Sequence, residues 1–170
     1  MRKLYVLFGT LLVCAVAGCS EDLNEELVKN TVQILDNTTS DLEQVTKTLN
    51  SAVTEAKSSN KPLDIAKIAR ANQEAGGLKN KARDLQDRKA RMDVRKDNVT
   101  TAEREDYAAK FKPAMAKALQ RLDAAEKNLE VALREADAVA DNDGKSSLEK
   151  LRHTLKDAQS EFEVLTKRQS

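Results

Sequence analysis

The chain has 170 residues, with 29 basic and 28 acidic side chains, 3% aromatic residues and no tryptophan. This near-neutral charge argues against a dedicated nucleic-acid binder, and the scarcity of aromatic rings disfavours surfaces that stack sugars or bases. Two prolines and five glycines are few for the turns of a strand-rich domain, so the composition is that of long helices.

The first 18 residues have the three-part organisation of a secretory signal peptide. Arg2 and Lys3 form a basic start, and an apolar run of 14 residues, 4–17, follows with small residues at its end. A membrane-spanning helix needs about 20 apolar residues, so this run is short for a span. An uncleaved N-terminal anchor and an ordinary secreted protein are the alternatives.

Val16-Ala17-Gly18-Cys19 ends this segment with an aliphatic residue, two small residues and a cysteine. This order resembles the lipobox of bacterial lipoproteins. The resemblance implies cleavage before Cys19, a diacylglycerol on the Cys19 thiol and a further acyl chain, such as palmitate, on the new N-terminus. Two chains give stable membrane anchoring, whereas one holds weakly.

Ser20 follows the cysteine, at the position where aspartate tends to retain enterobacterial lipoproteins at the inner membrane. The resemblance therefore favours the periplasmic face of the outer membrane over the cytoplasmic membrane. It extends over the first 20 residues only, and no family is recognised for the rest of the chain.

Processing of this kind would leave no free thiol, because Cys14 leaves with the signal and Cys19 carries lipid. Without disulfides or zinc–thiolate sites, stability must come from packing. The remaining charge is uneven, since residues 19–60 contain 3 basic and 8 acidic residues, and residues 61–112 contain 14 and 9. Consecutive segments of opposite sign favour antiparallel helices that lie side by side.

Residues 19–24 are a short polar tether, and a first helix is expected from there to about Lys57. Its heptad stripe is sustained for four heptads and consists of Val28, Thr31, Leu35, Thr38, Leu42, Val45, Leu49, Ala52 and Ala56. Residues 58–62 predict a turn, with Pro62 in the first turn of the next helix.

The second helix is expected to be weaker. Its apolar side begins with Leu63, Ile65, Ala66, Ile68 and Ala69. Gly76-Gly77 either ends this helix or is spanned at a cost of about 1 kcal/mol per glycine. Beyond the glycines the stripe is narrow, with Leu78, Leu85, Met92 and Val99 at seven-residue spacing.

A capping box, Thr100-Thr101-Ala102-Glu103, predicts the start of the best helix in the chain. Pro113 lies inside it and is expected to kink or restart it. Its stripe is unbroken and alternates large residues with alanine, which favours close helix approach; it contains Ala108, Phe111, Met115, Ala118, Leu122, Ala125, Leu129, Ala132, Ala136 and Val139.

Residues 141–144 read as a turn, and a second capping box, residues 146–149, predicts the start of the last helix. The stripe of that helix contains Leu148, Leu151, Leu155, Ala158, Phe162 and Leu165. Together these patterns predict an all-α domain over residues 25–170, an elongated up-and-down bundle or antiparallel coiled coil of about four helical segments.

Three features of the sequence are candidate functional sites. Asp141-Asn142-Asp143-Gly144 has the acidic half of a calcium loop but lacks its remaining ligands, so a helix–helix turn is the better interpretation. His153 falls at the outermost heptad position and should face solvent. The acids lie on polar faces, with none at a core heptad position, so no metal-binding carboxylate cluster and no other cofactor site is expected.

A fourth feature is a run of eight cations in eighteen residues, Lys79, Lys81, Arg83, Arg88, Lys89, Arg91, Arg95 and Lys96. It could contact anionic lipid, lipopolysaccharide or glycan, although Asp84–Arg88 and Asp87–Arg91 at i,i+4 spacing suit an ordinary solvated helix face. No nucleophile or phosphate-loop motif is present. The sequence therefore favours a non-enzymatic, lipid-anchored envelope scaffold, spacer or adaptor that binds another envelope protein or itself. A binding module for an apolar or anionic envelope ligand is the alternative.

Overall fold

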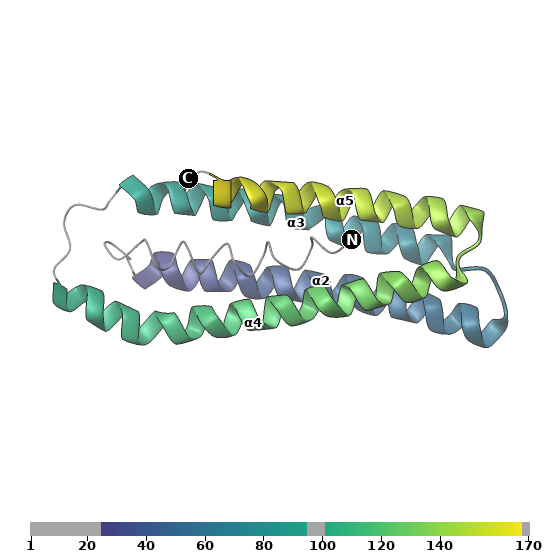
Figure 1. Cartoon of the computed structure of the whole chain (residues 1–170), viewed down its shortest axis with the longest axis horizontal. Helices are drawn as coiled ribbons and strands as arrows, with labels where there is room; N and C mark the ends of the chain where they lie inside the picture. The colour runs from purple at the N-terminus through teal and green to yellow at the C-terminus, as the bar shows by residue number, and fades with distance from the viewer. Residues whose placement is uncertain (1–24, 95–100, 168–170) are drawn as a thin grey trace.

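The computed structural model describes the backbone of residues 25–94 and 101–167, and side chains mainly within residues 29–84 and 116–161. This part of the chain contains no strand and forms four helices, α2 (Glu25–Ser59), α3 (Ile65–Val94), α4 (Thr101–Val139) and α5 (Asn142–Lys167). Consecutive helices run in opposite directions and form an elongated bundle (Figure 1). The predicted all-α, up-and-down fold class is confirmed, with α4 about 58 Å long at 1.5 Å per residue.

The helices pack as two pairs. α2 makes its most extensive contacts with α4, and the ion pairs Asp36–Arg121 and Lys57–Glu135 join the two. From the first ion pair to the second, the residue number rises in both helices, from 36 to 57 in α2 and from 121 to 135 in α4. The two helices therefore lie side by side and run in the same direction. The bundle is therefore up and down in chain order, while the two helices in closest contact are parallel.

α3 and α5 form the second parallel pair. The Thr154 hydroxyl donates to the Asn72 side chain at 2.7 Å, and the Arg83 guanidinium donates to Glu161 at 2.9 Å. Lys79 lies 3.8 Å from the same Glu161 carboxylate. α2 and α3 also pack against one another, and this contact joins the two parallel pairs.

Opposite charges join α2 to α3. Lys81 of α3 pairs with Asp41 of α2 at 2.5 Å, and Lys67 pairs with Glu55. The acidic and basic segments predicted to lie side by side as antiparallel helices do so, which confirms the expectation drawn from the charge distribution.

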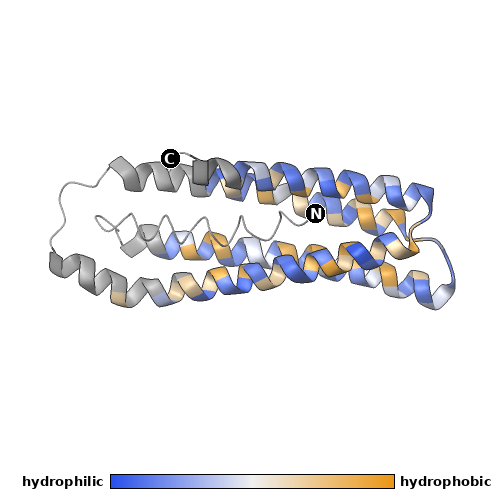
Figure 2. Cartoon of the chain, viewed as in Figure 1, coloured by the Kyte–Doolittle hydropathy of each residue, from blue (hydrophilic) through white to orange (hydrophobic). Residues whose placement is uncertain are grey.

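The predicted heptad stripes of the first, third and fourth helices form the core wherever their side chains are described. Buried residues of these stripes are Leu35, Leu42, Val45, Leu49 and Ala52 of α2, Leu122, Ala125 and Leu129 of α4, and Leu148, Leu151, Leu155 and Ala158 of α5. Hydrophobic and hydrophilic residues recur in alternation along each helix (Figure 2). Burial of these side chains supplies most of the folding free energy.

α2 also buries threonines whose hydroxyl groups form hydrogen bonds within the helix. Thr38, Thr39 and Thr46 each donate to the carbonyl oxygen four residues earlier, at 2.7, 2.9 and 2.8 Å. This local hydrogen bond removes the cost of burying a hydroxyl without a partner. Threonine is therefore compatible with a core position here.

The apolar side predicted at the start of the second helix is partly wrong. Leu63 and Ile68 are buried, but Ile65 is 46% exposed, and Ala66 and Ala69 are also exposed. α3 begins only at Ile65, with the Asp64 carboxylate accepting a hydrogen bond from the Ala66 N–H at 2.9 Å. Pro62 thus lies before the helix, and the helical phase set by this cap turns residues 65, 66 and 69 outward.

Neither Gly76-Gly77 nor Pro113 ends its helix. α3 continues through the glycine pair to Val94, and α4 continues through Pro113 from Thr101 to Val139. Of the two alternatives for the glycines, the spanned helix is the observed one, and the predicted restart at Pro113 does not occur.

The last predicted helix start is also wrong. α5 begins at Asn142, four residues before the expected capping box, and Asp141 provides the cap. The connection from α4 is only Ala140 and Asp141. No helix in the described part of the chain is long and apolar enough to cross a membrane.

Candidate functional site: the seam between α4 and α5

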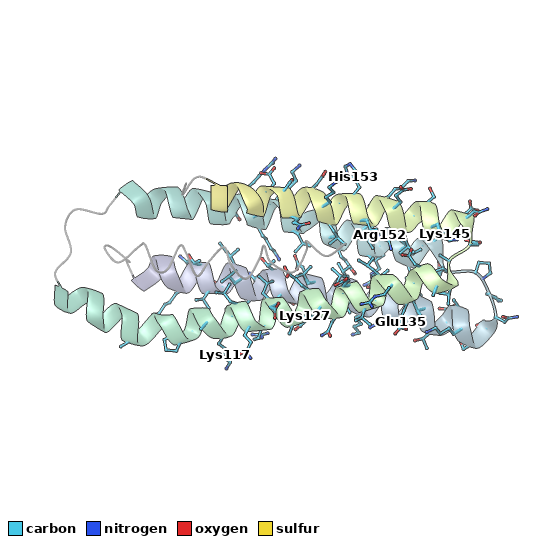
Figure 3. All side chains as sticks on the ribbon, in the orientation of Figure 1. Lys117, Lys127, Glu135, Lys145, Arg152 and His153 are labelled. Atoms are coloured by element: carbon cyan, nitrogen blue, oxygen red, sulfur yellow. The ribbon has the colours of Figure 1, made fainter. Side chains whose placement is uncertain are left out.

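The lipid attachment predicted at Cys19, and the whole of residues 1–24, lie outside the described residues. His153 is exposed and points away from the bundle (Figure 3), with its Nδ1 3.5 Å from Asp157. Its predicted solvent-facing position is confirmed. Residues 141–144 form the α4–α5 connection and the first turn of α5, as the helix–helix interpretation requires.

The first three cations of the basic run are engaged in ion pairs between helices. Lys79 and Arg83 contact Glu161 of α5, and Lys81 contacts Asp41 of α2. The side chains of Arg88, Lys89, Arg91, Arg95 and Lys96 lie outside the described residues, as do both predicted i,i+4 pairs. The described part of the run therefore joins helices rather than forming a free cationic face.

A different feature was not predicted, and it lies where α4 faces α5. Glu126, Glu130, Leu133 and Asp137 follow i, i+4, i+7 and i+11 spacing, so they form one line along α4. Asp137 pairs with Arg152 of α5, which shows that this line faces α5. On α5 the facing line contains Arg152, Leu155 and Gln159. We call these seven residues the α4–α5 seam.

The seam is the least extensive of the four main helix contacts. α4 and α5 touch far less than the other three packed pairs, and their described contact is anchored by the Asp137–Arg152 pair close to the connection. Figure 3 places Arg152 between the two helices. Separating α4 from α5 gives up fewer contacts than separating any of the other three packed pairs, so the bundle opens more easily along this side than along those three.

Glu126 is the unusual residue of the seam. It is only 4% exposed, and neither carboxyl oxygen has a hydrogen-bond partner among the described residues. Burial raises the pKa of Glu126 from 4.5 to about 9, repulsion from Asp123 adds to this rise, and attraction to Lys127 opposes it. At neutral pH the carboxyl group is therefore protonated, because a buried charge without a partner is too costly.

Glu130 lies one turn further along the same line. Its Oε2 atom is buried and also has no hydrogen-bond partner among the described residues. Seven residues separate Glu130 from Asp137, and seven separate Gln159 from Arg152, so Glu130 and Gln159 lie at about the same level, roughly 10 Å from the ion pair. The seam therefore has two acids on α4 and an amide on α5 that lies at about the level of Glu130.

The seam contains buried carboxyl oxygens that have no hydrogen-bond partner among the described residues. Carboxyl oxygens without partners can accept hydrogen bonds or pair with an ammonium or guanidinium group. Within the described residues, no group of three or more His, Cys, Asp or Glu side chains is arranged to hold a metal ion.

The prediction that carboxylates stay on polar faces is wrong for Glu126. With Leu122 at position a, Glu126 falls at e, beside the core stripe, and a two-helix heptad would leave that position partly exposed. In this four-helix arrangement α4 has a second neighbour on its e side. The sequence contains a signal for the burial of Glu126. Leu119 and Leu133 occupy the e positions seven residues before and after it, and leucine at both positions indicates that this side of the helix is covered.

Over the residues that the structure describes, the chain is an all-α bundle of four helices that buries the Glu126 carboxyl group without a hydrogen-bond partner. Comparison with protein-family models, with curated proteins and with solved structures finds no match in any of the three.

Proposed function

We propose that the protein is a lipid-anchored bacterial envelope protein whose helical domain acts, without enzymatic activity, as a scaffold or adaptor for another envelope protein. The lipobox-like Val16-Ala17-Gly18-Cys19 behind an apolar segment carries the anchoring part of this proposal. Lipid on Cys19 would hold the bundle at the membrane surface, most favourably the periplasmic face of the outer membrane.

The adaptor role rests on the architecture. The bundle is elongated, its helices are joined by ion pairs, and the core is filled by leucine and alanine. Such a domain offers long helical faces for another protein. The seam favours an adaptor over an inert spacer. The Glu126 carboxyl group is buried without a hydrogen-bond partner among the described residues, which lowers the stability of the bundle, and a second protein could supply that partner.

Membrane anchoring has a direct test in intact cells. Cys19→Ser should move the full-length protein from the membrane fraction to the soluble fraction, because the thioether to the diacylglycerol cannot form. In an enterobacterial host, Ser20→Asp serves as the matched variant and should move the protein to the inner membrane without releasing it. If Cys19→Ser remains in the membrane fraction, the lipoprotein proposal is wrong.

The adaptor role is tested by cross-linking on intact cells, affinity capture and mass spectrometry. Cross-links to another envelope protein support it. Cross-links only between copies of this chain would instead favour a spacer or self-assembling coat.

A second candidate, a module that binds an apolar envelope ligand, is favoured by the low contact between α4 and α5. The bundle could open there and enclose an acyl chain. A saturable rise in melting temperature with lipid would support this function. The version in which the basic run binds an anionic polymer has less support, since Lys79, Lys81 and Arg83 are already paired.

A further inference from the structure

The seam differs from the other three helix contacts in how its charges are placed. Ion pairs cross from α2 to α3, from α2 to α4 and from α3 to α5 at several levels of the bundle. Among the described residues, Asp137–Arg152 is the one ion pair that crosses from α4 to α5, and it lies next to the connection. Away from the connection, both carboxyl oxygens of Glu126 and Oε2 of Glu130 have no hydrogen-bond partner among the described residues.

The charges around Glu126 leave it as the acid without a counterion. Lys127 donates to Asp123 at 2.6 Å on the same helix, so this lysine is engaged, and Asp123 is compensated. From α5 the described charged group on the seam is Arg152, which is held by Asp137. The ion pairs between α2 and α4 use Arg121 and Glu135, which both lie on the opposite flank of the core stripe from Glu126.

The spacing of the residues along the seam suits the binding of a helix. The line of Leu119, Glu126, Leu133 and their neighbours up to Asp137 has the i, i+4, i+7 spacing that an inserted helix meets with its own apolar face. It extends over about 27 Å of α4, which is five helical turns. Leu133 packs partly buried against the core, and Leu155 of α5 is buried in the same core.

The charge of the occupant follows from Glu126. A lysine or arginine placed opposite this carboxyl group would let it ionise and form a charge-assisted hydrogen bond in a dry site. A wholly apolar occupant would leave its oxygens without partners, and an acidic one would add repulsion from Asp123 and Glu130.

We propose that the α4–α5 seam is the docking site for an amphipathic helix of an envelope partner protein, with a lysine or arginine on its apolar face that pairs with Glu126. The proposal rests on the adaptor function proposed above and names the surface used. The partner helix would separate α4 from α5 beyond the Asp137–Arg152 pair, exchanging a sparse helix contact for a new one.

The test is site-specific photo-cross-linking in intact bacterial cells that make the full-length chain. A p-benzoylphenylalanine residue replaces Leu133, inside the seam, or Val131, which is 48% exposed on the same helix. The position-133 probe should cross-link to a segment of an envelope protein that has apolar residues at three- and four-residue spacing and a basic residue on that face. The position-131 probe should not label this segment.

Charge variants show whether Glu126 makes the pairing. Glu126→Gln keeps the size of the side chain and should lower the position-133 yield by about tenfold or more, as the loss of a buried charge pair does. Glu135→Gln, on the flank of α4 that pairs with Lys57 of α2, should leave the yield unchanged. Glu126→Lys should abolish the cross-link, and exchange of the partner's basic residue for glutamate should restore it.

Three results would overturn the proposal: position-133 cross-links only to lipid or to a second copy of the chain, a labelled segment without a basic residue, or equal labelling from positions 131 and 133. A protein cross-linked from position 131 alone would retain the adaptor function and reject the seam as its site. Melting temperatures of the purified variants identify any that fail to fold.

Discussion

The Asp141 carboxylate accepts a hydrogen bond from the backbone N–H of Gly144, with 2.8 Å between Oδ1 and N. The Asp141 carbonyl oxygen also accepts from the Lys145 N–H at 2.9 Å, which is the first bond of α5. Asp141 is thus the N-cap of α5, and its negative charge lies at the positive end of the helix dipole. Because only Ala140 precedes it, this cap also sets the tight reversal between α4 and α5.

Asp141→Ala should lower the free energy of unfolding by about 1 kcal/mol, because the Gly144 N–H loses its acceptor. Ser146→Ala tests the alternative start predicted from the sequence and should change stability by less than about 0.5 kcal/mol, since Ser146 lies exposed within the helix. Urea denaturation of both variants measures the difference. A larger loss for Ser146→Ala would mean that α5 begins four residues later.

Gly76→Ala should raise the free energy of unfolding by about 1 kcal/mol, because alanine restricts the unfolded chain and favours helix. The space exists, since a Cβ atom at Gly76 would meet nothing within 4 Å. Gly77→Ala is the matched variant, with its Cβ 3.7 Å from Asp41 Oδ2, an ordinary contact. Thermal unfolding checks both. Destabilisation by either substitution would show that the helix is interrupted at the glycine pair.

Much of this fold could be predicted because heptad spacing reports which residues share a helical face. Leu35, Leu122 and Leu148 each lie in a predicted stripe and are buried. The opposite charges of residues 19–60 and 61–112 also predicted that α2 and α3 lie side by side, as Lys81 and Asp41 show.

What the sequence could not provide is the order of the helices around the bundle. A heptad stripe is the same whether α2 packs on α3, α4 or α5, so the parallel α2–α4 pair and the low contact of α4 with α5 were not predicted. The burial of Glu126 depends on that order. Local caps also competed, because Ser146 and Asp141 both precede suitable helical residues and only the backbone of the connection selects Asp141.

Leu122→Asp should lower the free energy of unfolding by about 3–5 kcal/mol, because it buries a carboxylate where no partner is available. Leu122 is 1% exposed in the middle of the α4 stripe. Gln120→Asp, two residues earlier on the exposed side, introduces the same charge and should have little effect. Circular dichroism during thermal unfolding distinguishes them. Equal melting temperatures would mean that the stripe is not the core.

Glu126 predicts an unusual dependence of stability on pH. Its pKa is raised in the folded state to about 9 from 4.5, so the folded protein binds one more proton than the unfolded chain between these values. Stability therefore falls as pH rises from about 4.5 through 9, and the full cost is present above the folded pKa. At pH 7 the shift lowers the free energy of unfolding by about 3 kcal/mol, from 1.36 kcal/mol per pKa unit.

Glu126→Gln removes this titration while keeping a neutral side chain of nearly the same shape. The variant should match the wild-type protein near pH 4.5, exceed its stability by about 3 kcal/mol at pH 7, and exceed it further at pH 9. Urea denaturation at the three pH values gives the comparison, with Glu135→Gln as a control for the loss of one half-exposed acid from the flank of α4 that faces α2. A stability gain that stays constant with pH would show that the Glu126 carboxyl is hydrated and ionised, and that the α4–α5 seam stands open to water.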